Sequence, residues 1–194
     1  MRVSDDRYSR DLQRLNLAMR FIHHEARTQT IRAWTGLTDD RIRKLYRTYV
    51  SEAGAAAVPR HRGKSPQQAA YFSRTPRLQL ETGTLASYLS MLNVVPPHGA
   101  REGFRSVASI ARGQALCEAY EMYRSVVRCA QISFEHAVFL VRALCQGDEL
   151  RLGNCVDCDS VVVVDRLSLR DSRCVPCSAA SARREPANPN RRVA

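Results

Sequence analysis

The sequence predicts a mainly α-helical protein: a helical body containing a helix-turn-helix-like unit, then a small zinc-ribbon-like module with four cysteines. Three observations predict it. Apolar residues recur at helical spacing through most of residues 1–150, a glycine turn joins two of these segments, and two Cys-x2-Cys pairs follow. We therefore expect a helical body at 1–150, a zinc module at 151–180 and a disordered basic tail at 181–194.

Two helices and a linker are predicted at the start of the chain. The first helix covers residues 5–34, where apolar side chains form one stripe: Leu12, Leu15, Met19, Ile22 and Ala26. This stripe packs on the protein's own core or on a partner helix, since the spacing suits both. The second helix covers about 38–51. Residues 54–66 contain prolines, glycines and basic residues without an apolar period, which predicts a linker.

Three further segments complete the predicted body. Residues 67–93 read as helix interrupted by Pro76 and Gly83, and residues 103–130 read as a long helical stretch. Residues 133–146 form the last helix, which Ser133 is placed to cap.

The cysteines outside the two pairs and the C-terminal composition support two smaller predictions. Cys117, Cys129 and Cys145 occur singly within helical patterns, so we interpret them as core or near-core residues. From about residue 178 the chain is rich in Ala, Arg, Pro and Asn, a composition that predicts disorder.

The two cysteine pairs predict one structural zinc ion, with ligands Cys155, Cys158, Cys174 and Cys177. Two residues between cysteines let both sulfurs face one metal, and four thiolates in a tetrahedron suit Zn2+ without an open position. The valines at 161–164 form a short strand that returns the second pair to the first. Four-cysteine iron and redox disulfides are alternatives, but no other feature of the sequence indicates redox chemistry.

Residues 28–47 have the layout of a helix-turn-helix. Gly36 can end the first helix in the left-handed conformation, Leu37 follows as a buried turn residue, and Thr38 is placed to cap the second helix. Four basic side chains on this helix would be exposed to phosphates or guanine edges: Arg41, Arg43, Lys44 and Arg47. A plain helix hairpin shows the same pattern, so these residues alone leave DNA binding open.

Charge narrows the class of partner only in part. The formal net charge of +11 and the pI near 9.8 favour polyanions such as DNA, RNA or an anionic membrane. However, only Lys44 and Lys64 among the 30 basic residues are lysine, a bias that a GC-rich genome produces without selection for binding. No long apolar run and no signal-peptide pattern occur, so we expect a cytoplasmic protein without a membrane partner.

Taken together, these patterns resemble the FlhC family, subunits of the flagellar master transcriptional activator. The resemblance covers most of residues 8–180 and is strongest at 41–46 and in the cysteine region. Three runs carry it, in the same order as in the family: Leu15-Asn16-Leu17-Ala18-Met19, the stretch 37–49 centred on Arg41-Ile42-Arg43-Lys44-Leu45-Tyr46, and Ala137-Val138-Phe139-Leu140-Val141-Arg142 ahead of the cysteine pairs. It implies a helical regulator with the four cysteines as zinc ligands. It also implies assembly with FlhD into a hetero-oligomer that activates flagellar and motility promoters.

The predicted function is a DNA-binding transcriptional activator with FlhD, promoter double-stranded DNA and RNA polymerase as partners. The alternative is an RNA-binding or ribosome-associated zinc protein, since zinc knuckles in arginine-rich surroundings also occur there. The helix-turn-helix favours duplex DNA, and few aromatics interrupt the basic segments for single-strand stacking. We do not expect an enzyme, because His23, His24 and His136 lie on predicted helices without a nearby nucleophile or ligand set.

Overall fold

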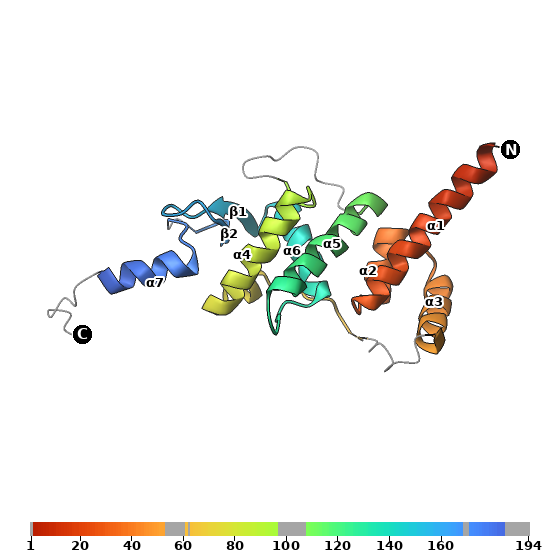
Figure 1. The fold of residues 1–194 in the computed structure, drawn as a ribbon, viewed down its shortest axis with the longest axis horizontal. Coiled ribbons are helices and arrows are strands. Elements are labelled where there is room, and N and C mark those ends of the chain that lie inside the picture. Colours follow the sequence, from red (N-terminus) through yellow and green to blue (C-terminus); the bar gives the residue numbers. More distant parts are fainter. Residues whose placement is uncertain (1, 53–60, 62, 97–107, 169–170, 185–194) are drawn as a thin grey trace.

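The computed structural model describes residues 2–52, 61, 63–96, 108–168 and 171–184 (Figure 1). These residues form seven α-helices, one short 3-10 helix (η1) and one two-stranded sheet. Their bounds are α1 Arg2–His23, α2 Thr28–Thr35, α3 Asp39–Glu52, η1 Ala69–Ser73, α4 Pro76–Met91, α5 Ile110–Val126, α6 Phe134–Gln146, β1 Leu150–Asn154, β2 Val161–Asp165 and α7 Val175–Arg184. The prediction of a mainly helical body followed by a small cysteine-containing module is therefore confirmed.

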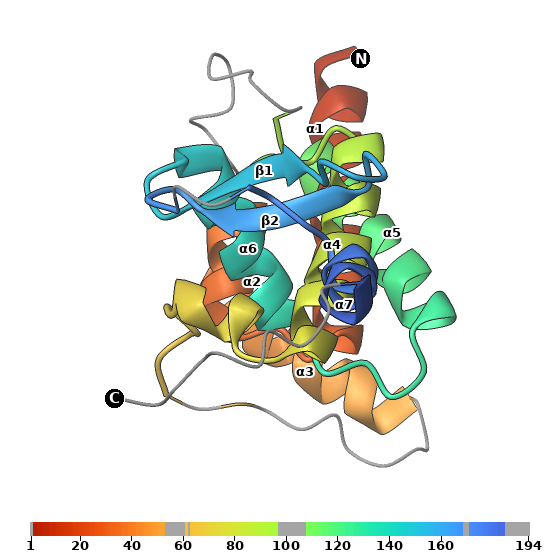
Figure 2. The ribbon, with the colours of Figure 1, turned by 90° about the vertical axis from the view of Figure 1, so that its left-hand side faces the viewer.

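The helices and the hairpin follow one another along the long axis of the molecule. Figure 1 shows α1, α2 and α3 at one end, α4, α5 and α6 in the middle, and the β1–β2 hairpin with α7 at the other end. Seen from the hairpin end, the two strands lie across α4 and α6 (Figure 2). The predicted helix-turn-helix and the predicted metal site therefore occupy opposite ends of the fold.

The core is built where α1, α2, α5 and α6 meet. The Phe21 ring packs edge-on against Phe134 with 4.9 Å between centroids, and lies 5.9 Å from the ring of Trp34. Gly113 lets α5 approach closely, because a Cβ there would lie 2.7 Å from a methyl carbon of Leu17. Buried aromatic rings and one close helix contact thus fix α1 and α2 onto the rest of the body.

The predicted helix over residues 5–34 is wrong at its middle. The Glu25 N–H donates to the Ile22 carbonyl at 2.9 Å, and the Ala26 N–H donates to the Phe21 carbonyl at 2.9 Å. This bond pair is a Schellman cap, and Glu25 adopts the left-handed conformation (φ 60°) that glycine usually supplies. The chain therefore turns between α1 and α2.

The predicted apolar stripe of α1 is only partly buried. Ile22 and Ala26, at its C-terminal end, are in the core, but Leu12 is 45% exposed. The face that α1 buries is centred on Leu17 and Phe21 instead. The reason is that the first half of α1 projects past the other helices and has no core to meet (Figure 1).

The remaining helix predictions differ from the structure mainly at helix starts. The interruption predicted at Pro76 is confirmed, because η1 ends at Ser73 and α4 begins at Pro76. Gly83 does not interrupt α4; it lies under β2, where a Cβ would come within 3.0 Å of the Val161 carbonyl oxygen. The helix predicted over 103–130 begins only at Ile110, after the capping residue Ser109, and residues 103–107 lie outside the described part. Ser133 caps α6 as predicted.

The predictions for single cysteines, the linker and the tail have mixed outcomes. Cys117 and Cys145 are buried as expected, but Cys129 is exposed in the turn after α5, so that prediction is wrong. The prediction of disorder from about residue 178, and of a disordered tail from 181, is wrong as far as Arg184, where α7 ends. Residues 185–194 and most of the predicted 54–66 linker lie outside the described residues.

Candidate metal centre and nucleic-acid interface

The candidate metal centre is built on the β1–β2 hairpin. The strands pair antiparallel from Leu150↔Asp165 to Asn154↔Val161, and this pairing closes the loop 155–160 that carries the first two cysteines. Within the loop, the Cys155 N–H donates to the Ser160 carbonyl at 2.9 Å, and the Asp159 N–H donates to the Cys155 carbonyl at 2.9 Å. The sequence predicted the valine strand β2, whereas β1 was missed.

Four cysteine sulfurs converge at the end of this hairpin. Cys155 and Cys158 come from the loop, Cys174 immediately precedes α7, and Cys177 lies in its first turn. All four Sγ atoms lie within 4.8 Å of one another, and those of Cys158 and Cys174 are 3.6 Å apart. A tetrahedral site with metal–sulfur bonds of about 2.3 Å requires sulfur separations of about 3.8 Å. The four predicted ligands are therefore close enough to hold one metal ion.

Hydrogen bonds prepare two of these sulfurs for the thiolate form that metals bind. The Cys174 N–H donates to Cys155 Sγ at 3.3 Å, and this bond, helped by the N–H groups of Asp157 and Cys158, lowers the pKa of Cys155 to about 6 against the effect of burial. The Ser160 hydroxyl and N–H lower the pKa of Cys158. The pKa of Cys177 is raised, because its thiol donates to Cys174 and Cys158. Cys155 and Cys158 are thus the two sulfurs whose surroundings favour the thiolate form, which is the form that binds metals.

The hairpin is fixed to the helical body rather than linked to it loosely. Leu150 is buried in the main core, and Leu152 and Val163 pack against that core. The Arg166 guanidinium also donates to the Gly147 carbonyl at the end of α6. The boundary predicted at 150/151 is thus a change of secondary structure within one continuous core.

The predicted helix-turn-helix layout is present in α2, the turn and α3. Gly36 has the left-handed conformation (φ 69°), and its N–H donates to the Arg32 carbonyl at the end of α2. Leu37 is buried in the turn, and the Thr38 hydroxyl accepts from the Arg41 N–H at 3.4 Å at the start of α3. The Tyr46 hydroxyl donates to the Ala26 carbonyl at 2.6 Å and ties α3 to the α1–α2 turn. The sequence predicted each of these local features except the hydrogen bond between Tyr46 and Ala26.

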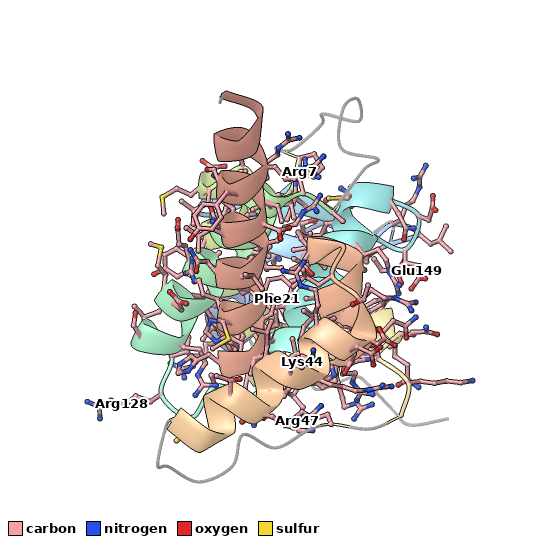
Figure 3. All side chains as sticks on the ribbon, turned by 90° about the vertical axis from the view of Figure 1, so that its right-hand side faces the viewer. Arg7, Phe21, Lys44, Arg47, Arg128 and Glu149 are labelled. Atoms are coloured by element: carbon pink, nitrogen blue, oxygen red, sulfur yellow. The ribbon has the colours of Figure 1, made fainter. Side chains whose placement is uncertain are left out.

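The four predicted DNA-contacting side chains, Arg41, Arg43, Lys44 and Arg47, are all exposed on α3. Figure 3 shows Lys44 and Arg47 on α3 at the end of the molecule that faces away from the hairpin. Arg41 forms an ion pair of 3.1 Å with Asp11 of α1, and Arg43 forms one of 2.9 Å with Asp40 of α3. Neither Lys44 nor Arg47 forms a side-chain ion pair with any of the described residues. No local pattern in the sequence indicates that Asp11 belongs to this site.

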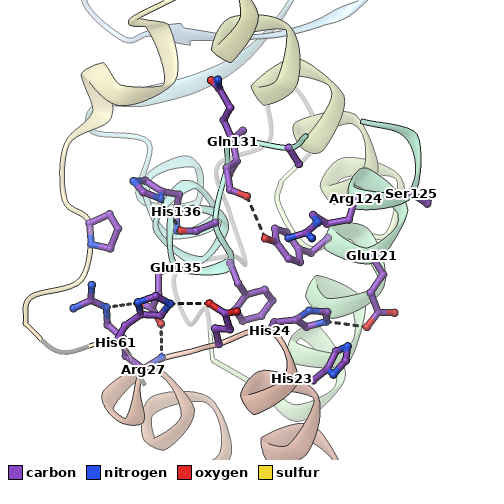
Figure 4. Close-up of a pocket in the computed structure, with 17 residues that line it drawn as sticks. His23, His24, Arg27, His61, Glu121, Arg124, Ser125, Gln131, Glu135 and His136 are labelled. Carbon is purple, nitrogen blue, oxygen red and sulfur yellow. Dashed lines mark hydrogen bonds and ion pairs between the residues drawn. The ribbon is translucent and has the colours of Figure 1, made fainter. Parts of the chain in front are cut away.

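Four histidines line one cavity of about 690 Å³: His23, His24, His61 and His136 (Figure 4). It lies between the end of α1, α5, the start of α6 and the residues His61 and Pro66. Three of its imidazoles are held by hydrogen bonds: His24 to Glu121 at 2.9 Å, His61 to Glu25 at 2.8 Å and His136 to Ser133 at 2.7 Å.

Burial, the largest effect on both groups, lowers the pKa of His24 and of His136. Within the described residues the four cysteines form the only group of three or more potential metal ligands this close together. Ser133, the hydroxyl nearest to His136, caps α6 and so has a structural role. The cavity therefore holds no second metal cluster among the described side chains.

The chain matches no model of a known protein family and no curated protein sequence. None of the helices in the described ranges combines the length and apolar character needed to span a bilayer. The cysteine cluster and the α2–α3 unit are therefore the features of the described structure that bear on function.

Proposed function

We propose that this protein is a DNA-binding transcriptional activator of flagellar and motility genes that acts in a hetero-oligomer with FlhD. The observation that carries the proposal is the α2–Gly36–α3 unit, in which one helix is anchored by Ile42 and Tyr46 and exposes four cations. The resemblance to the FlhC family is strongest at residues 41–46, within the same helix. The helix geometry and the sequence resemblance thus both support the exposed face of α3 as the DNA-contacting surface.

The chemistry of α3 suits duplex DNA. An α-helix fits the major groove of B-DNA, and arginine can bind the O6 and N7 atoms of guanine with two parallel hydrogen bonds. In this assignment Arg41 and Arg43 reach base edges or phosphates, while Lys44 and Arg47 contact the phosphate backbone. Asp39 and Asp40 lie in the first turn of α3, where their negative charges interact favourably with the helix dipole. The same charges repel DNA phosphates, so α3 must dock with its first turn away from the DNA backbone.

The cysteine cluster is assigned to one structural zinc ion per chain. Four thiolate donors are typical of closed zinc sites, and this closed set leaves no position for a substrate or a reactive water. Binding of Zn2+ would join the hairpin loop to the start of α7 and contribute folding free energy to the C-terminal module. The proposal therefore assigns no catalytic activity to the protein.

A promoter-binding experiment tests this function. The zinc-loaded full chain is co-purified with FlhD, and binding to a labelled flagellar promoter fragment is measured over a range of salt concentrations. Lys44→Ala and Arg47→Ala should each weaken binding and reduce the slope of log K against log salt by about 0.9, since one phosphate contact is lost. Arg142→Ala removes the same charge from an exposed position on α6 and should leave the slope unchanged.

Two outcomes would contradict the proposal. The first is failure of the wild-type chain to bind FlhD or promoter DNA. The second is equal weakening by all three substitutions, which would indicate general charge attraction rather than a contact surface on α3. Tighter binding of structured or single-stranded RNA than of duplex DNA would instead support a role as an RNA-binding zinc protein.

A further inference from the structure

Two of the four cations on α3 are neutralised by carboxylates of the same chain. Arg41 Nη2 lies 3.1 Å from Asp11 Oδ2, and Arg43 Nη1 lies 2.9 Å from Asp40 Oδ1. Asp11 also has Arg14 within 4.0 Å, so its carboxylate lies between two guanidinium groups. The charge that α3 presents to an approaching polyanion is consequently reduced at these two arginines.

These ion pairs are exposed and therefore easily broken. The side chains of Arg41 and Asp11 are 47% and 41% exposed, and those of Arg43 and Asp40 are 54% and 83% exposed. Exposed pairs of this kind are weak because water and salt screen them. A phosphate or a guanine edge can therefore replace either carboxylate, at a small but finite energetic penalty.

We propose that Asp11 and Asp40 mask Arg41 and Arg43 in the free protein, so that DNA must displace both carboxylates before these two arginines can bind it. This inference rests on the proposed function and adds a regulation of the same surface. Lys44 and Arg47 are the cations of the set that can meet DNA at first encounter.

The mask acts against non-specific binding. A single phosphate contact merely replaces one charge-assisted hydrogen bond with another, so it gains little over the carboxylate it displaces. A guanine bound by two parallel hydrogen bonds in the groove gains more, because it adds base recognition that the carboxylate cannot imitate. Specific sites therefore gain more free energy from the released arginines than non-specific DNA does, and this difference favours the specific site.

The size of the effect follows from the strength of exposed ion pairs. Their measured range corresponds to a factor of about 1.4 to 5 in an equilibrium constant for each pair. Removing one mask should therefore raise the affinity for non-specific duplex DNA by about 1.4- to fivefold. Each freed arginine that then contacts a phosphate should add about 0.9 to the slope of log K against log salt.

The experiment measures binding of the zinc-loaded full chain to a short duplex of mixed sequence without a flagellar promoter, by fluorescence anisotropy. Asp40→Asn and Asp11→Asn are the test variants. Asp39→Asn is the matched control, since Asp39 is also in the first turn of α3 but lies 3.8 Å from Arg32, outside the set of four. Circular dichroism verifies that every variant is folded.

A second set of variants separates masking from a general loss of negative charge. Asp40→Asn is combined with Arg43→Ala, and Asp11→Asn with Arg41→Ala. If the aspartates act by masking, the gain in affinity disappears once the masked arginine is absent. If they act by long-range repulsion of DNA, the gain persists in the double variants.

The results have distinct meanings. Masking is supported when Asp40→Asn and Asp11→Asn exceed the control in affinity and lose their gain in the arginine-free backgrounds. It is overturned, while the proposed function stands, when the wild-type chain binds promoter DNA but the control gains as much or the double variants keep their gain. Absence of DNA binding by every protein, including the unmasked ones and the FlhD complex, overturns both.

Discussion

Replacing the buried carboxylate of Glu81 by an amide is expected to destabilise the helical body. Glu81 lies on α4 and is 3% exposed. Its Oε2 accepts from the Tyr123 hydroxyl of α5 at 2.5 Å and from the Gln131 N–H at 2.8 Å, and its Oε1 accepts from Arg77 Nε at 2.9 Å. Burial alone would raise the pKa of Glu81, but these three donors outweigh it and lower the pKa. One carboxylate therefore joins α4, α5 and the turn before α6.

The expected magnitude follows from this count of bonds. Hydrogen bonds to a charged group contribute about 1.5–3 kcal/mol each, and leaving a buried partner unsatisfied adds to the loss. In Glu81→Gln one acceptor oxygen becomes a donor, so we expect a loss of about 2–4 kcal/mol in the free energy of unfolding. Tyr123→Phe removes one bond of the same set and should cost about 1.5–3 kcal/mol.

Urea denaturation followed by far-ultraviolet circular dichroism, with zinc present, measures these losses. The two substitutions share one bond, so the double variant should be less destabilised than the sum of the single ones by at least about 1 kcal/mol. Strict additivity would refute the reasoning, because it would mean that the Tyr123–Glu81 bond contributes nothing.

Acidification provides a second readout of the same group. Because the folded-state pKa of Glu81 is lowered, its contribution to stability is complete above its unfolded value of about 4.3 and is lost as the pH falls through the folded value. The stability difference between wild type and Glu81→Gln should therefore shrink only in that acidic range.

Two further predictions concern the metal centre and the turn of the helix-turn-helix. Cys174→Ser should lose bound zinc and the order of the hairpin, whereas Cys129→Ser, which changes an exposed cysteine outside the cluster, should keep about one zinc per chain by metal analysis; full zinc content in Cys174→Ser would contradict the assignment. Gly36→Ala places a side chain at φ 69° and should lower the free energy of unfolding by about 1 kcal/mol in the same urea assay, while an unchanged or raised stability would show that the turn is not strained.

Features defined by neighbouring residues could be predicted from the sequence. The ends of α2 and α6 follow from local signals: Gly36 ends α2, and Ser133 caps α6. The cysteine cluster could also be predicted, because the Cys-x2-Cys spacing itself brings the two sulfurs of each pair together. In these cases the residues that determine the structure lie within one or two turns of chain.

Features that depend on distant contacts could not be predicted. The break between α1 and α2 contains no glycine, so nothing in its composition separates it from a continuing helix. Strand β1 (Leu150–Asn154) has only a short apolar alternation, and pairing with β2 defines it. Asp11 and Arg41 are 30 residues apart, so only the packing of α1 beside α3 reveals their ion pair.

The cysteine cluster lies too far from α3 to take part in the DNA contacts proposed for that helix. The hairpin and α7 lie at the end of the molecule opposite to α3, so the cluster cannot position the four cations by direct contact (Figure 1). Any effect of the cluster on α3 must be transmitted through the helical body. The hairpin contacts that body through Leu150, which is buried in the core, and at Gly83, where β2 packs closely against α4. Loss of metal would remove the constraint that holds the loop 155–160 to α7, while α2 and α3 would keep the packing of Phe21 and Trp34. Metal removal should therefore weaken the C-terminal module first, and a loss of DNA binding that precedes hairpin unfolding would place the nucleic-acid surface at the cysteine end instead of on α3.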